Sequence, residues 1–160
     1  MSDFRILVTG SRNYSRPELV ATYLDHYTRH AIENGKRPVL VHGHCPTGAD
    51  RFADEWAEGR NSAARSEVIR VERVPADWGR ACDENCYHYA REDGRCPLAG
   101  HLRNAEMVSR GADVVLAFAE GDPISPGTRN CMKHARSAGL TVIDVTKTTR
   151  PDTEGTLFDV

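Results

Sequence analysis

Three cysteines and a histidine occur within a stretch of fifteen residues in the middle of the chain: Cys82, Cys86, His88 and Cys96. Thiolate sulfur and imidazole nitrogen are the ligands that tetrahedral zinc prefers. The stretch between them is polar, with too few apolar side chains to hold itself in place without a crosslink. The spacing therefore predicts a structural zinc site formed by these residues. His101 is the alternative fourth ligand, and reduced, unliganded thiols are the alternative state.

Small residues in three other segments have the chemistry of an anion site. Glycine lets the backbone approach a ligand closely, and the free N–H groups at a helix N-terminus attract phosphate. The segments are residues 9–12, 43–50 and 121–128. Arg103 and Asn104 add a guanidinium that can clamp a phosphate and an amide that can contact a base or ribose. The predicted ligand-binding residues are Gly10, Ser11, Arg12, Gly43, Gly48, Asp50, Arg103, Asn104, Gly127 and Thr128.

Several of these residues also have a purely structural interpretation. Asp50 stands where the first turn of a helix is expected, so it can cap that helix instead of binding ribose hydroxyls. Arg103 and Asn104 fit a solvated helix face with one salt bridge. Trp78 can stack on a base or simply pack against a loop. Neither a Walker A loop nor a G-x-G-x-x-G motif occurs, which argues against P-loop and classical dinucleotide chemistry.

Alternating strands and helices are expected to position these residues. Short, β-branched runs predict strands over residues 4–10, 38–42, 67–74, 113–118 and 140–145. Between them, helices are predicted from the Ser15-to-Glu18 capping box to Gly35, over 48–58, over 98–110 with Leu102 facing inward, and from Gly127 onward. This alternation predicts an α/β, Rossmann-like fold, with a mainly parallel five-stranded sheet and helices on both faces. Ligands bind such sheets at the carboxyl ends of the strands, where the three segments lie.

Length and composition limit the classes of function. A chain of 160 residues supports one core. We expect one domain over 1–146, with a Cys-rich insertion at 79–101, and a polar tail over 147–160. With 21 basic against 23 acidic residues, the chain lacks the charge of a duplex DNA-binding surface. The apolar run near the N-terminus is far shorter than a membrane span or signal segment, so a cytoplasmic protein without membrane contact is expected.

Several motifs together resemble a known family. The stretches VTGSRNY, LVHGHCPTGADRFADEWA, PADW, CPLAGHLRNAEMV and GADVVLAFAEG, followed by PGTRNCMKHARSAGLTVI, occur in order between residues 4 and 145. They resemble the SLOG superfamily, and within it the small YspA-like proteins of bacteria and phages. In simpler members of that family the Cys-rich region is a short connection.

The resemblance implies a Rossmann-like domain that binds a nucleotide or a nucleotide-derived small molecule, as a sensor or binding protein. Related phosphoribohydrolases carry an Arg-Lys pair before a Met, which Arg103, Asn104 and Met107 match in part. Their catalytic Glu corresponds to Asn130 here, and an amide cannot act as a carboxylate base.

Two other functions stay open. One is a nucleotide N-glycosidase or phosphoribohydrolase that uses Asp50 or Glu106 in place of the missing Glu. The other is a single-stranded DNA-binding module similar to DprA, for which the scarcity of aromatic residues is unfavourable. Relatives often pair through helices, so a homo-oligomer is also expected.

Overall fold

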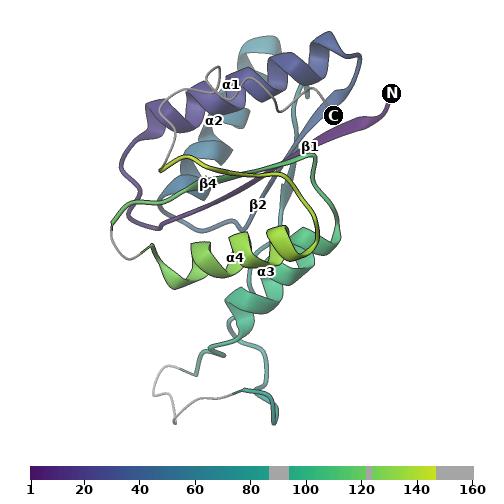
Figure 1. Cartoon of the computed structure of the whole chain (residues 1–160). Helices are drawn as coiled ribbons and strands as arrows, with labels where there is room; N and C mark the ends of the chain where they lie inside the picture. The colour runs from purple at the N-terminus through teal and green to yellow at the C-terminus, as the bar shows by residue number, and fades with distance from the viewer. Residues whose placement is uncertain (87–93, 122–123, 147–160) are drawn as a thin grey trace.

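The computed structural model describes residues 1–86, 94–121 and 124–146 (Figure 1). Strands and helices alternate through the described chain: β1 (Asp3–Gly10), α1 (Pro17–Glu33), β2 (Arg37–His42), α2 (Ala49–Ala64), β3 (Arg70–Arg73), α3 (Ala99–Ser109), β4 (Val114–Phe118), α4 (Pro126–Ser137) and β5 (Val142–Asp144). The strands form one sheet in the order β3-β2-β1-β4-β5. Every neighbouring pair is parallel, which confirms the predicted fold class. The predicted tail, 147–160, lies outside the described residues.

Helices cover both faces of the sheet. Figure 1 shows α1 and α2 on one side and α3 and α4 on the other. Alternate residues of β1 serve the two layers: Ile6 and Val8 pack with α1 and α2, whereas Leu7 packs with α3 and α4. Because both faces are buried, the central strands read as nearly continuous apolar runs rather than as an apolar-polar alternation.

The order of the strands reverses between β1 and β4. After β1 the chain adds β2 and β3 on one side, and then it returns to place β4 and β5 on the other. At such a switch point the loops that follow the two central strands diverge, and they leave a crevice at the carboxyl ends. The fold therefore puts the turns after β1, β2 and β4 around one opening.

The predicted capping box before α1 is wrong. The Ser15 hydroxyl donates to Oε1 of Glu120 at 2.7 Å, and the Ser15 N–H donates to the same oxygen at 3.1 Å. No side chain caps the helix, which begins at Pro17. A tertiary contact with the loop after β4 replaces the local motif, because that carboxylate satisfies both Ser15 donors together.

The inward face of α3 also differs from the prediction. Leu102 was expected to face the core, but its side chain is 48% exposed. The buried residues of this helix include Asn104 and Met107 instead. A polar residue takes an inward position because its amide joins α3 to α4, and apolar spacing alone gives no sign of such a bond.

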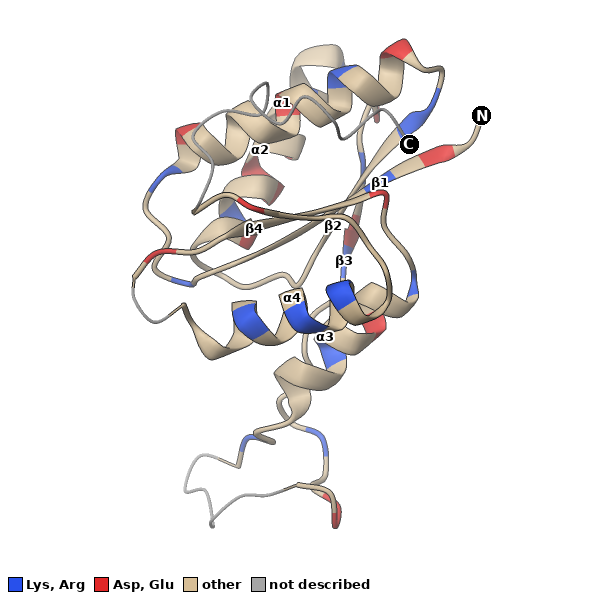
Figure 2. Cartoon of the chain, viewed as in Figure 1, with Lys and Arg blue, Asp and Glu red and all other residues tan. Residues whose placement is uncertain are grey.

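Basic and acidic residues both occur along the strands and helices of the described chain (Figure 2). One partly buried group bridges two strands that flank β2: Glu72 on β3 accepts hydrogen bonds from Nη1 and Nη2 of Arg5 on β1 at 2.9 and 2.8 Å. Arg70 donates to the same carboxylate at 2.7 Å. These bonds, led by those from Arg5, lower the pKa of Glu72 from 4.5 to about 2 although partial burial opposes the shift.

We expect Glu72→Gln to lower the free energy of unfolding by about 2 kcal/mol at neutral pH, an estimate reduced for partial solvent screening. The folded-state pKa is depressed, so the stabilisation is present above the unfolded-state pKa and is lost as the pH falls toward about 2. Urea unfolding at a series of pH values checks this. The difference between wild type and variant should shrink below pH 4.5, whereas Glu55→Gln, in an exposed pair, should change little at any pH. A constant difference down to about pH 3 would contradict the assignment.

Candidate functional site

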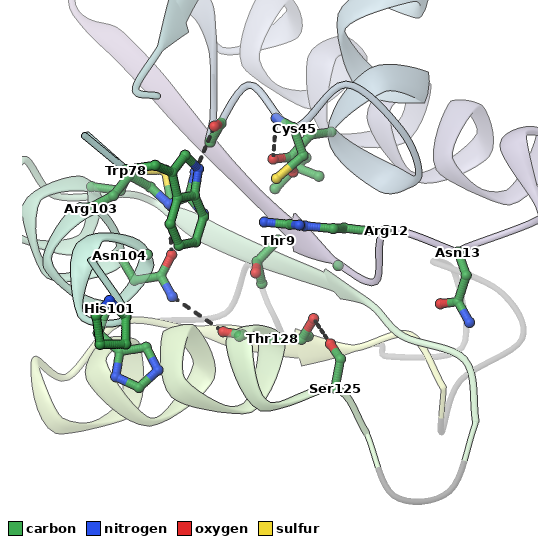
Figure 3. Close-up of a pocket in the computed structure, with 18 residues that line it drawn as sticks. Thr9, Arg12, Asn13, Cys45, Trp78, His101, Arg103, Asn104, Ser125 and Thr128 are labelled. Carbon is green, nitrogen blue, oxygen red and sulfur yellow. Dashed lines mark hydrogen bonds between the residues drawn. The ribbon is translucent and has the colours of Figure 1, made fainter. Parts of the chain in front are cut away.

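A cavity of about 390 Å³ opens at the carboxyl edge of the sheet (Figure 3). Its walls come from the end of β1, the turn between β2 and α2, Trp78, α3 and the start of α4. This is the crevice expected at the switch point between β1 and β4. Of the ten residues predicted to bind a ligand, the cavity brings together Gly10, Arg12, Gly43, Asp50, Arg103, Asn104, Gly127 and Thr128.

Arg103 is held firmly in the wall of the cavity. Its Nη1 donates to the Gly43 carbonyl oxygen at 2.6 Å, and its Nε donates to Oδ1 of Asn104 at 3.0 Å. Within the described residues, Nη2 has no hydrogen-bond partner. The backbone of the β2–α2 turn therefore orients the guanidinium, and the N–H groups on Nη2 are available to donate to a ligand.

Arg12 approaches the cavity from the loop after β1. Its guanidinium lies 5.5 Å from the centre of the Trp78 ring, a cation–π distance, and Figure 3 shows the side chain extending across the cavity. In the described part of the chain, neither Arg12 nor Arg103 forms an ion pair, and Asp50 is the one carboxylate in the lining. Two guanidinium groups against one carboxylate make the lining electropositive.

The side-chain amide of Asn104 forms hydrogen bonds within the protein. The side chain is 4% exposed, and Nδ2 donates to the Gly127 carbonyl oxygen at 3.2 Å and to Oδ1 of Asn130 at 3.1 Å. Oδ1 of Asn104 accepts from Arg103. This amide joins α3 to the first turns of α4 and orients Arg103. Its contact with a ribose or base stays a prediction.

Two polar groups line the cavity from the first turns of α2 and α4. Asp50, 6% exposed, accepts the N–H of Cys45 at 3.2 Å and does not cap α2, whose N-cap residue is Gly48. The Thr128 hydroxyl lies 2.8 Å from the Ser125 hydroxyl. Both helix N-termini therefore point toward the same space, where their partial positive charges favour an anion.

Two predicted residues, Ser11 and Gly48, are absent from the lining. Ser11 is 1% exposed, and its N–H donates to the Phe118 carbonyl oxygen at 2.9 Å. Gly48 has a φ of 76° and lies so close to the backbone of Ser11 and Arg12 that a Cβ would overlap it. These two residues hold the loop after β1 against the start of α2, so they support the cavity wall without lining it.

The lining also includes polar residues that the sequence reasoning missed, namely Thr9, Asn13 and Ser125. Two of them lie within segments that the sequence singled out, 9–12 and 121–128, but were not chosen as ligand-binding residues. Thr9 is next to Gly10 at a strand end, and Ser125 precedes Pro126, which begins α4. A polar residue at the end of a strand, or just before the first residue of a helix, can therefore be chosen from the sequence as a candidate lining residue.

The candidate catalytic residues are separated by the fold. Asp50 lies in the cavity, but Glu106 is exposed on α3, where it pairs with Arg110, and it does not line the cavity. Burial, together with the nearby Asp50 carboxylate, raises the pKa of the Cys45 thiol. Cys45 therefore stays protonated near neutral pH and is a poor nucleophile.

The Cys-rich segment brings three sulfur atoms together. The Sγ atoms of Cys82, Cys86 and Cys96 lie within 4.8 Å of one another, and those of Cys86 and Cys96 are 3.6 Å apart. With Zn–S bonds of about 2.3 Å, tetrahedral thiolate ligands stand about 3.8 Å apart, so the cluster fits zinc. His88 lies outside the described residues. His101, the alternative fourth ligand, lines the cavity and does not join the cluster.

Arg80 lies beside this cluster. Its Nη1 donates to Sγ of Cys86 at 3.3 Å and to Sγ of Cys96 at 3.1 Å. Burial raises the pKa of Cys96, but hydrogen bonds, first that from Arg80, outweigh it and lower the pKa to about 7. The guanidinium thus compensates negative charge on the sulfur atoms.

Known proteins with similar sequences identify the family of this chain. A model of the YspA, cpYpsA-related SLOG family matches residues 4–80. The Gene 61 protein of Mycobacterium phage D29 is 38% identical over 143 residues, which cover 88% of this chain and 94% of that protein. The chain belongs to this SLOG family. The match confirms the resemblance seen in the sequence.

Among solved structures, this SLOG protein is similar to the Moco carrier protein from Chlamydomonas reinhardtii. The TM-score is 0.53 at 18% identity, with 98% of this chain and 83% of the other covered, so the likeness concerns the fold. The residues matched by the SLOG family model end just before Cys82. None of the helices in the described ranges combines the length and the apolar character that crossing a bilayer requires.

Proposed function

We propose that this SLOG protein binds a nucleotide or a nucleotide-derived small molecule in the cavity at the carboxyl edge of the sheet. One observation carries the proposal: Arg12 and Arg103, from distant parts of the chain, line the same cavity without an acidic partner in the described residues. Guanidinium groups in such a setting are suited to phosphate, which they bind through paired hydrogen bonds.

Each part of a nucleotide has a matching group in the lining. Arg12, Arg103 and the first turn of α4 attract the phosphate. The carboxylate of Asp50 accepts from ribose hydroxyls, and the indole of Trp78 offers a face for a base. The volume, about 390 Å³, is within the range of small-molecule sites.

Relatives support binding in preference to turnover. The similar solved structure is named a Moco carrier protein, and it shares the fold of this chain. Asn130 stands where related phosphoribohydrolases have their Glu, and here it accepts a hydrogen bond from Asn104. A binding protein or sensor therefore accords with the residues present.

Calorimetric titration with ribonucleoside monophosphates, ADP-ribose and cyclic nucleotides tests the proposal. We expect at least one to bind and Arg103→Ala to weaken that binding about 100-fold, the loss of a charged hydrogen-bonding group. Arg110→Ala is the matched control, because this arginine lies at the end of the same helix outside the cavity. Failure of the folded protein to bind any member of the panel would refute the proposal.

The position of Asp50 favours one second candidate function, N-glycosidic hydrolysis. It is the one carboxylate in the described lining, and glycosidic hydrolysis ordinarily uses carboxyl groups as acid, base or nucleophile. Chromatography of the same nucleotides after incubation would detect a released free base. Release that Asp50→Asn abolishes, and Glu106→Gln leaves intact, would establish an enzyme; complete recovery of the nucleotides would leave the binding function alone.

We also propose that the cysteine cluster binds one zinc ion. Elemental analysis of protein purified under reducing conditions should find one zinc per chain in wild type and less than about a tenth of that in Cys96→Ser. His88→Ala tests the predicted fourth ligand. Cys131→Ala, which removes a buried thiol in α4, is the control and should keep its zinc. Wild type that binds no zinc after reconstitution would contradict the assignment.

A further inference from the structure

The cysteine cluster and the cavity are joined through one short segment. Trp78, which lines the cavity, stands two residues before Arg80, whose guanidinium contacts two of the sulfur atoms. The N–H of Cys96 donates to the Trp78 carbonyl oxygen at 2.9 Å, and the Cys96 carbonyl oxygen accepts the N–H of Ala99, the first residue of α3, at 3.3 Å. The same residue thus provides a sulfur atom and fixes the backbone of the cavity wall.

Trp78 connects the backbone at Cys96 with the surroundings of the two cavity arginines. A Cβ on Gly100 would lie 3.2 Å from its indole, so the ring rests directly on the first turn of α3. Arg12 lies over the ring at 5.5 Å. Arg103 lies one turn further along α3. Loss of order at Trp78 therefore disturbs the surroundings of both guanidinium groups.

Few apolar contacts hold this segment in place. Among its described residues, 79–86 and 94–98, there is no helix or strand, and Cys96 is the single buried side chain. Figure 1 shows these residues extending beyond the N-terminal end of α3. Ordering such a stretch costs about 1–2 kcal/mol per residue, which so few apolar contacts do not offset. A metal crosslink supplies the missing constraint.

We infer that zinc at Cys82, Cys86 and Cys96 and a ligand in the cavity bind with positive coupling, because zinc orders Trp78 and the start of α3. The inference rests on the proposed ligand site. Coupling of this kind is reciprocal: zinc raises the affinity for the ligand, and the ligand slows the loss of zinc.

The first test needs no ligand. The chain has two tryptophans, so Trp56→Phe leaves Trp78 as the one fluorophore of its kind. Removing zinc from this variant with a chelator should shift Trp78 emission to longer wavelength, and added zinc should restore it. Cys82→Ser, at an exposed position, should show the shifted emission without a chelator, while circular dichroism shows an intact fold. Emission that is indifferent to zinc would overturn the inference.

The second test measures the coupling itself. The panel nucleotide that zinc-loaded wild type binds most tightly is titrated into zinc-loaded and zinc-free protein, with an expected loss of about 10-fold without zinc. The same nucleotide should slow zinc transfer to a chromophoric chelator. Trp78→Leu should keep zinc but remove the difference between the two titrations. Equal affinity with and without zinc overturns the coupling alone, whereas zinc-loaded protein that binds no nucleotide overturns the proposed function as well.

Discussion

Gly48→Ala is expected to lower the free energy of unfolding by about 4 kcal/mol, a large fraction of the total stability of a domain this size. Two causes add at this position. The φ of 76° lies in the left-handed region that disfavours side chains, and the new methyl group would overlap the Ser11 carbonyl oxygen and lie 2.7 Å from two Arg12 backbone atoms. Backbone atoms of a packed turn cannot move aside as a flexible side chain can. Urea unfolding measures the change.

Gly139→Ala separates the two causes. This glycine, just after α4, has the same φ of 76°, but no atom outside its immediate chain neighbours lies within 4 Å of the position that a Cβ would take. Its substitution should therefore cost only the conformational strain, about 1–2 kcal/mol. Equal losses for the two variants would show that the close contact between the loop after β1 and the start of α2 is not present in solution.

Gly43→Ala is expected to weaken nucleotide binding about 100-fold while the protein stays folded. A Cβ at Gly43 would overlap Nη1 of Arg103 and lie 2.6 Å from its Cζ. The φ of Gly43 is not in the left-handed region, so the backbone tolerates alanine and the arginine must move. The variant thus displaces the guanidinium without removing it. Calorimetric titration and thermal unfolding measure the two effects.

A double-mutant cycle checks that Arg103 is the cause. If the methyl group acts by displacing Arg103, the variant that combines Gly43→Ala with Arg103→Ala should bind no more weakly than Arg103→Ala alone. If the combined variant loses affinity by the product of the two single losses, Gly43 contributes to binding independently of Arg103. Unchanged affinity in Gly43→Ala would mean that the guanidinium position is unimportant.

The layered fold was predictable because strands that are buried on both faces have a recognisable, nearly continuous apolar sequence. The central strands are almost wholly apolar, and glycines or prolines bound most helices, so the strand count and parallel arrangement followed. Details set by tertiary contacts were not predictable. Ser15 matches a capping motif yet binds Glu120, and Leu102 has helical apolar spacing yet is exposed.

The site was predictable as a location but not residue by residue. Parallel strands place their carboxyl ends together, so eight predicted residues reached one cavity. Within a loop, however, neighbours have opposite roles: Gly10 and Arg12 line the cavity, while Ser11 between them is bonded to the protein. Asn104 lines the cavity, and its amide also joins two helices, which the sequence did not indicate. Which polar group is already satisfied depends on partners far away in the chain.

A backbone amide NMR titration tests the central claim most directly, because it reports where a ligand binds as well as whether it binds. Addition of the tightest-binding panel nucleotide to isotope-labelled protein should shift the amide signals of Gly10, Arg12, Gly43 and Gly127, which come from three separate loops around the cavity. Signals from residues outside the cavity, such as Arg29 on α1, should stay in place. Shifts that cluster away from the cavity, or no shifts with any nucleotide, would contradict the account.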